Sequence, residues 1–199
     1  MGAMRGVNIG GVAAWAAAIV VGLVLGAASA WGALEFGRAG FADRIGQWSY
    51  SRAAGARSAD PYTRAIIARD GLLALNAREA RYFSLERDEN GAPLRESCIY
   101  ELMGADLAAR WWSVTLYASD NFLAQNQDHA ESVDSTRLRG AWRARVAPVR
   151  GEAANWLSSR SAGRGFVLML RVYNADDGWR PSEAALPTLT TVSCAGDDS

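Results

Sequence analysis

The chain has 199 residues and a formal net charge of zero, with 21 acidic and 21 basic side chains. This balance excludes a strong overall field that would favour nucleic acid or an acidic partner. The sequence also contains no phosphate-binding or nucleic-acid-binding motif. A chain of this length suffices for one ordinary domain beside a membrane segment.

The amino-terminal stretch predicts a membrane-spanning helix. No charged residue lies between Arg5 and Glu35, and a spanning helix needs roughly 20 apolar residues. Arg5 and the free amino terminus precede the stretch, which favours an inner-membrane protein with a cytoplasmic amino terminus and a periplasmic carboxyl-terminal domain. The alternative is a signal peptide cleaved near Ala30, because small residues precede that point. We expect residues 1–36 to form the anchor or the signal peptide.

Small residues recur at every fourth position of this stretch. They are Ala14, Ala18, Gly22, Gly26 and Ala30. A glycine pair with this spacing lets two membrane helices approach closely, so we expect Gly22 and Gly26 to face a partner helix. The alternative is that the spacing follows from the abundance of small residues alone.

The next residues predict a linker followed by a helix. Residues 37–59 are rich in Gly, Ala, Arg and Ser, which is typical of a juxtamembrane linker, and we expect partial helix around 41–48. Asp60 suits a helix cap and Pro61 suits the first helical position. We expect one amphipathic helix from Pro61 to about Leu75, packed on a sheet.

The apolar pattern then changes to a period of two, which predicts strands. Asn90-Gly91 favours a tight hairpin turn after the first strand, and residues 151–165 predict a loop. The expected strands are 80–87, 96–103, 110–117, 132–138, 141–149, 166–173 and 188–194. One helix followed by these strands predicts an antiparallel β-sandwich or jelly roll over residues 60–196.

The chain has two cysteines, Cys98 and Cys194. Outside the cytosol such a pair is commonly oxidised. A bridge between them would tie the last expected strand to an early one. The alternative is two buried thiols.

Five short stretches resemble a known family. They are DPYTRA (60–65), NAREARYF (76–83), RWWSVTLY (110–117), NWL (155–157) and LRVYN (170–174). In this order they resemble the exported bacterial family called domain of unknown function 1214, over about Asp60 to Cys194. In larger relatives this domain follows domain of unknown function 1254. The resemblance implies a jelly-roll-like β fold and no established activity.

The strand 110–117 carries two different faces. Trp112, Val114 and Leu116 would point into the core, because neighbouring strand residues face opposite ways. The other face carries Trp111, Ser113, Thr115 and Tyr117. Aromatic rings with hydroxyls between them suit a sugar ring, so these four residues are candidates for ligand binding. The alternative is that another segment covers this face.

Arg171 and Tyr173 share one face of the strand 166–173. A buried arginine needs a partner, because an unpaired buried charge is costly, and Glu101 is the expected partner. Arg171, Glu101 and the tyrosines would either grip a polar ligand or form a structural ion pair.

A run of arginines follows residue 136. Alternation would place Arg143 and Arg145 on one face. The run indicates either contact with anionic lipid or an acidic glycan, or an exposed edge strand whose arginines block further pairing.

We therefore expect a non-catalytic binding module of the cell envelope, with a glycan or a protein as its partner. One alternative is a carbohydrate-active enzyme with Glu101 as the acid and with Arg171 and Tyr117 as positioning residues. Another is an accessory subunit recruited through its membrane helix. The single histidine, His129, stands in no ligand pattern, so we expect no metal and no cofactor.

Overall fold

The computed structural model describes residues 9–36, 43–50, 64, 75–76 and 78–195. The chain divides into two compact units, residues 1–40 and residues 41–199. The helix expected from Pro61 to about Leu75 falls almost wholly outside the described residues, so it stays a prediction.

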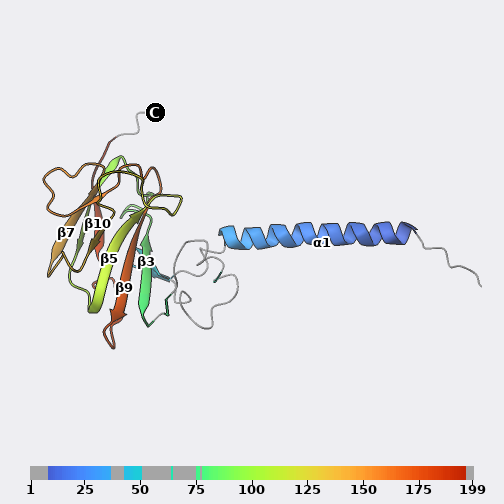
Figure 1. Cartoon of the computed structure of the whole chain (residues 1–199), viewed down its shortest axis with the longest axis horizontal. Helices are drawn as coiled ribbons and strands as arrows, with labels where there is room; N and C mark the ends of the chain where they lie inside the picture. Colours follow the sequence, from blue (N-terminus) through green and yellow to red (C-terminus); the bar gives the residue numbers. More distant parts are fainter. Residues whose placement is uncertain (1–8, 37–42, 51–63, 65–74, 77, 196–199) are drawn as a thin grey trace, which may run out of the picture. The chain divides into compact units, whose positions relative to one another are not determined.

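The first unit contains the helix α1 (Ile9–Phe36), which has 28 residues (Figure 1). Its segment Ala13–Ala33 is long and apolar enough to cross a membrane. A signal sequence near the amino terminus has the same properties. The helix therefore fits both expectations, an anchor and a signal peptide.

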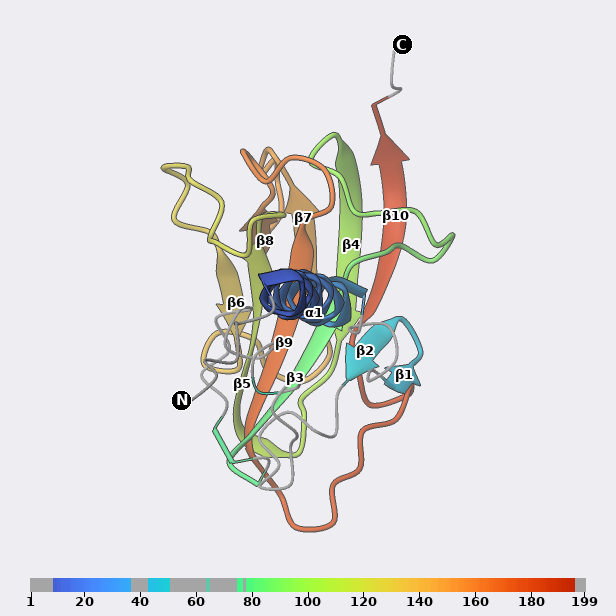
Figure 2. The same ribbon diagram turned by 90° about the vertical axis from the view of Figure 1, so that its right-hand side faces the viewer.

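The second unit contains two β-sheets (Figures 1 and 2). The six-stranded sheet has the order β1 (Asp43–Ile45), β2 (Trp48–Tyr50), β3 (Ala80–Leu85), β9 (Val167–Ala175), β5 (Ala109–Tyr117) and β6 (Ser132–Asp134). The four-stranded sheet has the order β10 (Thr188–Cys194), β4 (Cys98–Gly104), β7 (Trp142–Ala147) and β8 (Trp156–Ser158).

The predicted mainly β fold is confirmed, with two differences in the sheets. β8 lies inside the segment 151–165, where a loop is expected. It pairs with β7 in parallel, whereas the other neighbouring strands run antiparallel. A strand of three residues is too short to show a period-two pattern, which is why the sequence does not reveal it.

The core lies between the two sheets. Trp112 of β5 stacks on Trp142 of β7, with ring centroids 5.1 Å apart. Val114 and Leu116 follow Trp112 into the core and are fully buried, as the strand pattern predicts. Gly104 of β4 leaves room for the second tryptophan, because a Cβ at this position would lie 2.5 Å from a Trp142 ring carbon.

The hairpin formed by β1 and β2 overturns one expectation. Partial helix around residues 41–48, within a linker, is wrong because residues 43–50 form two antiparallel strands. Gly46 turns the chain between them with a φ of +59°, a conformation that glycine adopts at low cost. Trp48 is only 1% exposed and donates its indole N–H to the Pro187 carbonyl over 2.6 Å. The buried ring makes the hairpin part of the sandwich.

Side chains from two turns cover backbone groups of β10. The amide nitrogen of Gln47 donates to the Leu189 carbonyl over 2.8 Å, and the Leu189 N–H donates to the Gln47 side-chain oxygen over 2.8 Å. The Thr191 N–H donates to a Glu89 carboxylate oxygen over 2.9 Å. These bonds occupy the free edge of the strand, where a further strand would otherwise pair.

Trp48 tests whether the hairpin belongs to the folded domain. We expect Trp48→Ala to lower the free energy of unfolding by about 3–5 kcal/mol, because it empties a large core position. The control Arg44→Ala changes an exposed residue of β1 and should stay within about 0.5 kcal/mol. Urea unfolding of the full chain in detergent measures both. A loss below about 1 kcal/mol for Trp48→Ala would contradict the assignment.

Candidate functional site

The sequence-predicted site residues fall on two different sheets. Glu101 lies between the buried residues Tyr100 and Leu102 of β4, so its side chain points away from the core. Arg171 lies in the same way between buried residues of β9, in the other sheet. The two side chains therefore leave the sandwich through opposite faces. The expected Glu101–Arg171 pair is wrong, and so is the catalytic arrangement that needs it.

Arg171 instead belongs to an aromatic cluster on the six-stranded sheet. It donates to the Tyr117 hydroxyl over 2.6 Å, and its guanidinium carbon lies 5.3 Å from the centre of the Tyr117 ring. Trp111 and Tyr173 are cross-strand neighbours on the same face, with ring centroids 5.3 Å apart. The Tyr117 hydroxyl and ring are therefore the partners of the Arg171 guanidinium, and no carboxylate is needed in this role.

The hydroxyls between the aromatic rings are not available to a ligand. Ser113 is 4% exposed and Thr115 is 8% exposed. Tyr82 of β3 shares this face, because it pairs with Arg171 in register, and it is also buried. Burial raises the pKa of the Tyr82 hydroxyl. The face thus lacks the accessible ring-and-hydroxyl pattern on which sugar binding was expected.

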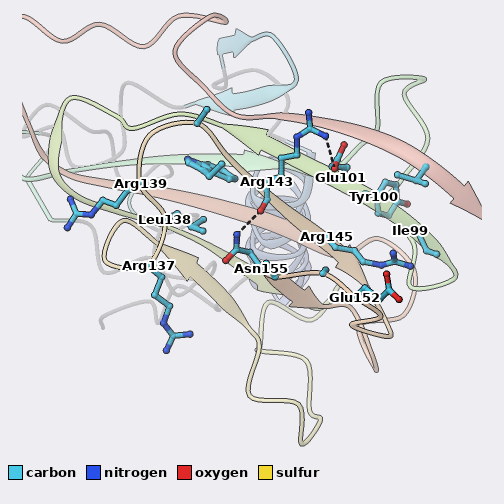
Figure 3. A pocket seen from close by; sticks show the side chains of 15 residues that line it. Ile99, Tyr100, Glu101, Arg137, Leu138, Arg139, Arg143, Arg145, Glu152 and Asn155 are labelled. Atoms are coloured by element: carbon cyan, nitrogen blue, oxygen red, sulfur yellow. Dashed lines mark hydrogen bonds and ion pairs between the residues drawn. The ribbon is translucent and has the colours of Figure 1, made fainter.

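A pocket lies on the other sheet, outside β4 and β7 (Figure 3). Its volume is about 710 Å³, which is within the range of about 300–1,000 Å³ typical of ligand sites. The lining is mixed, with charged, amide and aliphatic side chains. The charged ones are Glu101, Arg137, Arg139, Arg143, Arg145 and Glu152.

Strand alternation places two of these arginines in the pocket. Trp142, Ala144 and Val146 of β7 enter the core, so Arg143 and Arg145 between them point outward. β7 has β4 on one side and β8 on the other. The expectation of an edge strand protected by arginines is therefore wrong, because the two arginines lie on the face of a sheet with a neighbour on each side.

Glu101 pairs with only one of the two arginines. Arg145 is its direct neighbour across the strands, yet the carboxylate lies 3.6 Å from an Arg143 nitrogen. Both side chains of this pair are open to solvent, with 73% of Arg143 and 37% of Glu101 exposed. Such a pair contributes about 0–1 kcal/mol, so it leaves the pocket open to other partners.

Arg145 has no polar partner for its guanidinium among the described residues. Its Nε atom is buried and forms no hydrogen bond. A Cβ at Gly151 would lie 3.8 Å from the guanidinium carbon, so the loop after β7 packs closely on this group. An unsatisfied buried donor costs about 1–3 kcal/mol and calls for an explanation in a native structure.

Asn155 fastens the neighbouring loop to β7. Its side-chain amide nitrogen donates to the Arg143 backbone carbonyl over 2.9 Å, and its backbone carbonyl accepts the Arg145 backbone N–H over 2.9 Å. In the sequence, Asn155 stands out only as part of the family stretch NWL, and no sequence pattern singles out Glu152. Both residues reach the pocket through the pairing of β7 with β8, which a period-two pattern does not predict.

The disulfide holds one wall of the pocket. Cys98 and Cys194 are bridged and are direct partners across β4 and β10, which confirms the pairing expected from the sequence. Ile99 follows the first cysteine and Val192 precedes the second by two residues, and both line the pocket. The bridge thus keeps the two aliphatic side chains beside the arginines.

Among the described residues, no group of three or more His, Cys, Asp or Glu side chains could hold a metal ion. His129 lies exposed in the loop before β6. The arrangement on β4 and β7 is instead suited to charge recognition, because guanidinium groups bind carboxylates and phosphates through paired N–H groups.

The model of a family described as "Protein of unknown function (DUF1214)" matches residues 79–177, from the start of β3 to the turn after β9. The chain resembles this family. The match confirms the resemblance carried by the stretches NAREARYF, RWWSVTLY, NWL and LRVYN. DUF1214 carries no activity in its description, so the family adds no chemistry to the pocket.

Two solved structures resemble the chain. The crystal structure of the VPA0106 protein from Vibrio parahaemolyticus is 23% identical with a TM-score of 0.55, and the match covers 68% of this chain and 36% of that one. An uncharacterised protein from Burkholderia cenocepacia is 18% identical with a TM-score of 0.45, over 57% of this chain and 29% of that one. The first supports the fold alone. No curated protein matches the chain.

Removing the disulfide tests how much it contributes to the stability of the domain. We expect Cys98→Ala/Cys194→Ala to lower the free energy of unfolding by up to about 4–5 kcal/mol, because the bridge closes a long loop in the unfolded chain. Reductant should destabilise the native chain and leave the double variant unchanged. Thiol titration provides the second readout, and two reactive thiols in the unreduced, denatured chain would contradict the bridge.

Proposed function

We propose that the chain is a membrane-anchored, non-catalytic binding module that holds an anionic ligand in the pocket on the four-stranded sheet. The observation that carries the proposal is the unbalanced charge of this pocket. Four arginines and two glutamates line it, and Glu101–Arg143 is the one ion pair between described lining residues. In a chain whose net charge is zero, this excess of two positive charges is local.

The shape of the site favours a small ligand or one unit of a polymer over a broad protein interface. A protein–protein interface of standard size buries about 800 Å² on each partner. A pocket of about 710 Å³ is instead the size of a small-molecule site. We therefore place a glycan ahead of a protein partner. The aromatic cluster around Trp111 supports a binding role less well, since its hydroxyls are buried.

The position of the module in the cell is part of the proposal. α1 as an uncleaved anchor would hold the domain at the outer surface of the inner membrane, in the periplasm. A partner helix against Gly22 and Gly26, and with it the role of an accessory subunit, stays a prediction. A Cβ added at either glycine would have no neighbouring atom of a described residue within 4 Å beyond its own helix, so a partner helix could approach at both positions.

One observation favours a second candidate function. Glu101 and Glu152 line the same pocket, and two carboxylates across a cleft are the minimum for glycoside hydrolysis. The candidate enzyme would therefore use this pair, and not the cluster around Arg171. The binding role ranks first because Glu101 is engaged by Arg143.

A panel of ligands tests the proposed function on the full chain in detergent. We expect oligogalacturonate to raise the midpoint of thermal unfolding, because a ligand that binds only the folded state stabilises it. Neutral dextran should leave the midpoint unchanged. Added salt should reduce the effect, since it screens the charges. Polyglutamate and inorganic phosphate complete the panel as anions of other classes.

Paired charge variants locate the binding. Arg143→Gln/Arg145→Gln should abolish the midpoint shift, whereas Arg110→Gln/Arg180→Gln removes the same charge from exposed positions outside the pocket and should retain it. Equal losses in both variants, or no response to any anion, would refute the proposal. Reducing ends that accumulate during incubation, and that Glu101→Gln abolishes, would instead establish the enzyme.

A further inference from the structure

We propose that the pocket binds a uronic-acid unit of an acidic glycan and that Arg145 anchors the carboxylate of this unit. This inference rests on the proposed function, because it names the ligand class for the same pocket. It is carried by three features of the lining: an arginine whose buried Nε atom has no hydrogen-bond partner among the described residues, carboxylate and amide oxygens that can accept hydrogen bonds from hydroxyls, and aliphatic side chains (Figure 3).

Of the two arginines that β7 presents to the pocket, Arg145 is better suited to an incoming anion than Arg143. Its backbone is fixed on both sides, because it pairs with Glu101 of β4 and with Trp156 of β8. Its guanidinium forms no ion pair with a described residue, while the neighbouring Arg143 already pairs with Glu101. A ligand carboxylate that draws the guanidinium toward the pocket would also give the buried Nε the partner that it lacks.

The acceptors around Arg145 favour a hydroxyl-bearing ligand over a bare anion. Glu101 and Glu152 present carboxylate oxygens to the pocket, and these oxygens repel a phosphate but accept hydrogen bonds from hydroxyls. The side-chain amide nitrogen of Asn155 donates to the Arg143 carbonyl. Its side-chain oxygen accepts no hydrogen bond from a described residue, so it can accept one from a ligand. A sugar ring that carries one carboxylate and several hydroxyls matches this mixture of arginines and hydrogen-bond acceptors.

The aliphatic side chains complete the match. Ile99 and Val192 line the pocket, and Val192 is 62% exposed. A pyranose ring has an apolar C–H face that would cover these side chains and remove them from water. An acidic peptide has no such face, and its backbone carries N–H donors but no hydroxyls. We therefore argue for the glycan and treat a peptide as an outcome of the test.

Isothermal titration of the full chain in detergent tests the inference with four probes. Trigalacturonate is the expected ligand, and its methyl ester keeps the ring and hydroxyls but removes the charges. Inorganic phosphate and triglutamate represent a bare anion and an acidic peptide. We expect trigalacturonate to bind and the ester to bind at least about tenfold more weakly, since a charge-assisted hydrogen bond is lost. This comparison needs no variant, so it stands even if a variant misfolds.

Variants on one strand then identify the anchoring residue. Arg145→Gln should weaken trigalacturonate binding about tenfold or more. Arg145→Lys should recover part of it, because lysine keeps the charge but not the paired N–H groups. Arg143→Gln should cost about threefold or less, since Glu101 already partners this charge. Arg110→Gln lies outside the pocket and should leave binding unchanged, and circular dichroism checks that each variant is folded.

The possible results separate the carboxylate anchor, the role of Arg145, the ligand class and the proposed function. Equal affinity for trigalacturonate and its ester would overturn the carboxylate anchor. Equal losses for Arg145→Gln and Arg143→Gln would overturn the role of Arg145. Binding of phosphate or triglutamate without trigalacturonate would overturn the ligand class and leave the proposed function standing. Binding of none of the charged probes would overturn both.

Discussion

The contact between Trp142 and Trp112 decides which way β7 faces. The two rings stack between the sheets, with centroids 5.1 Å apart, and Gly104 leaves the space that this packing needs. A strand with Trp142 in the core must turn Arg143 and Arg145 outward, because side chains alternate along it. A shift of one residue in the register of β7 would place Arg143 and Arg145 in the core. This register is strongly unfavourable, because a buried charge without a partner costs a large free energy.

The neighbours of β7 turn these outward arginines into a site. β7 has β4 on one side and β8 on the other. Its two outward arginines therefore line one pocket together with Glu101 of β4 and Glu152 of the loop before β8. The opposite sheet offers an informative contrast, because Arg171 is satisfied there by the Tyr117 hydroxyl and ring. Arg171 therefore has partners within its own sheet, whereas the Nε atom of Arg145 has no hydrogen-bond partner among the described residues.

Local patterns predicted the local features of this chain. Alternation placed Trp112 in the core and Trp111 outside, and the two cysteines formed the expected bridge. Patterns failed where the answer depends on which strands share a sheet. The sequence suggests a pair of Glu101 and Arg171, but the two residues lie on different sheets, and no local pattern distinguishes the two sheets of a sandwich. The hairpin at 43–50 and β8 are not predicted because strands of three residues show no periodicity.

Both proposals require that Arg145 and its pocket form the ligand site. A crystal structure of the chain grown with trigalacturonate would show whether they do. We expect a carboxylate of the sugar within hydrogen-bond distance of the Arg145 guanidinium, with hydroxyls near Glu152 and Asn155. A sugar on the Trp111–Tyr173 face, or a protein group bonded to Arg145 Nε with the pocket empty of sugar, would contradict it.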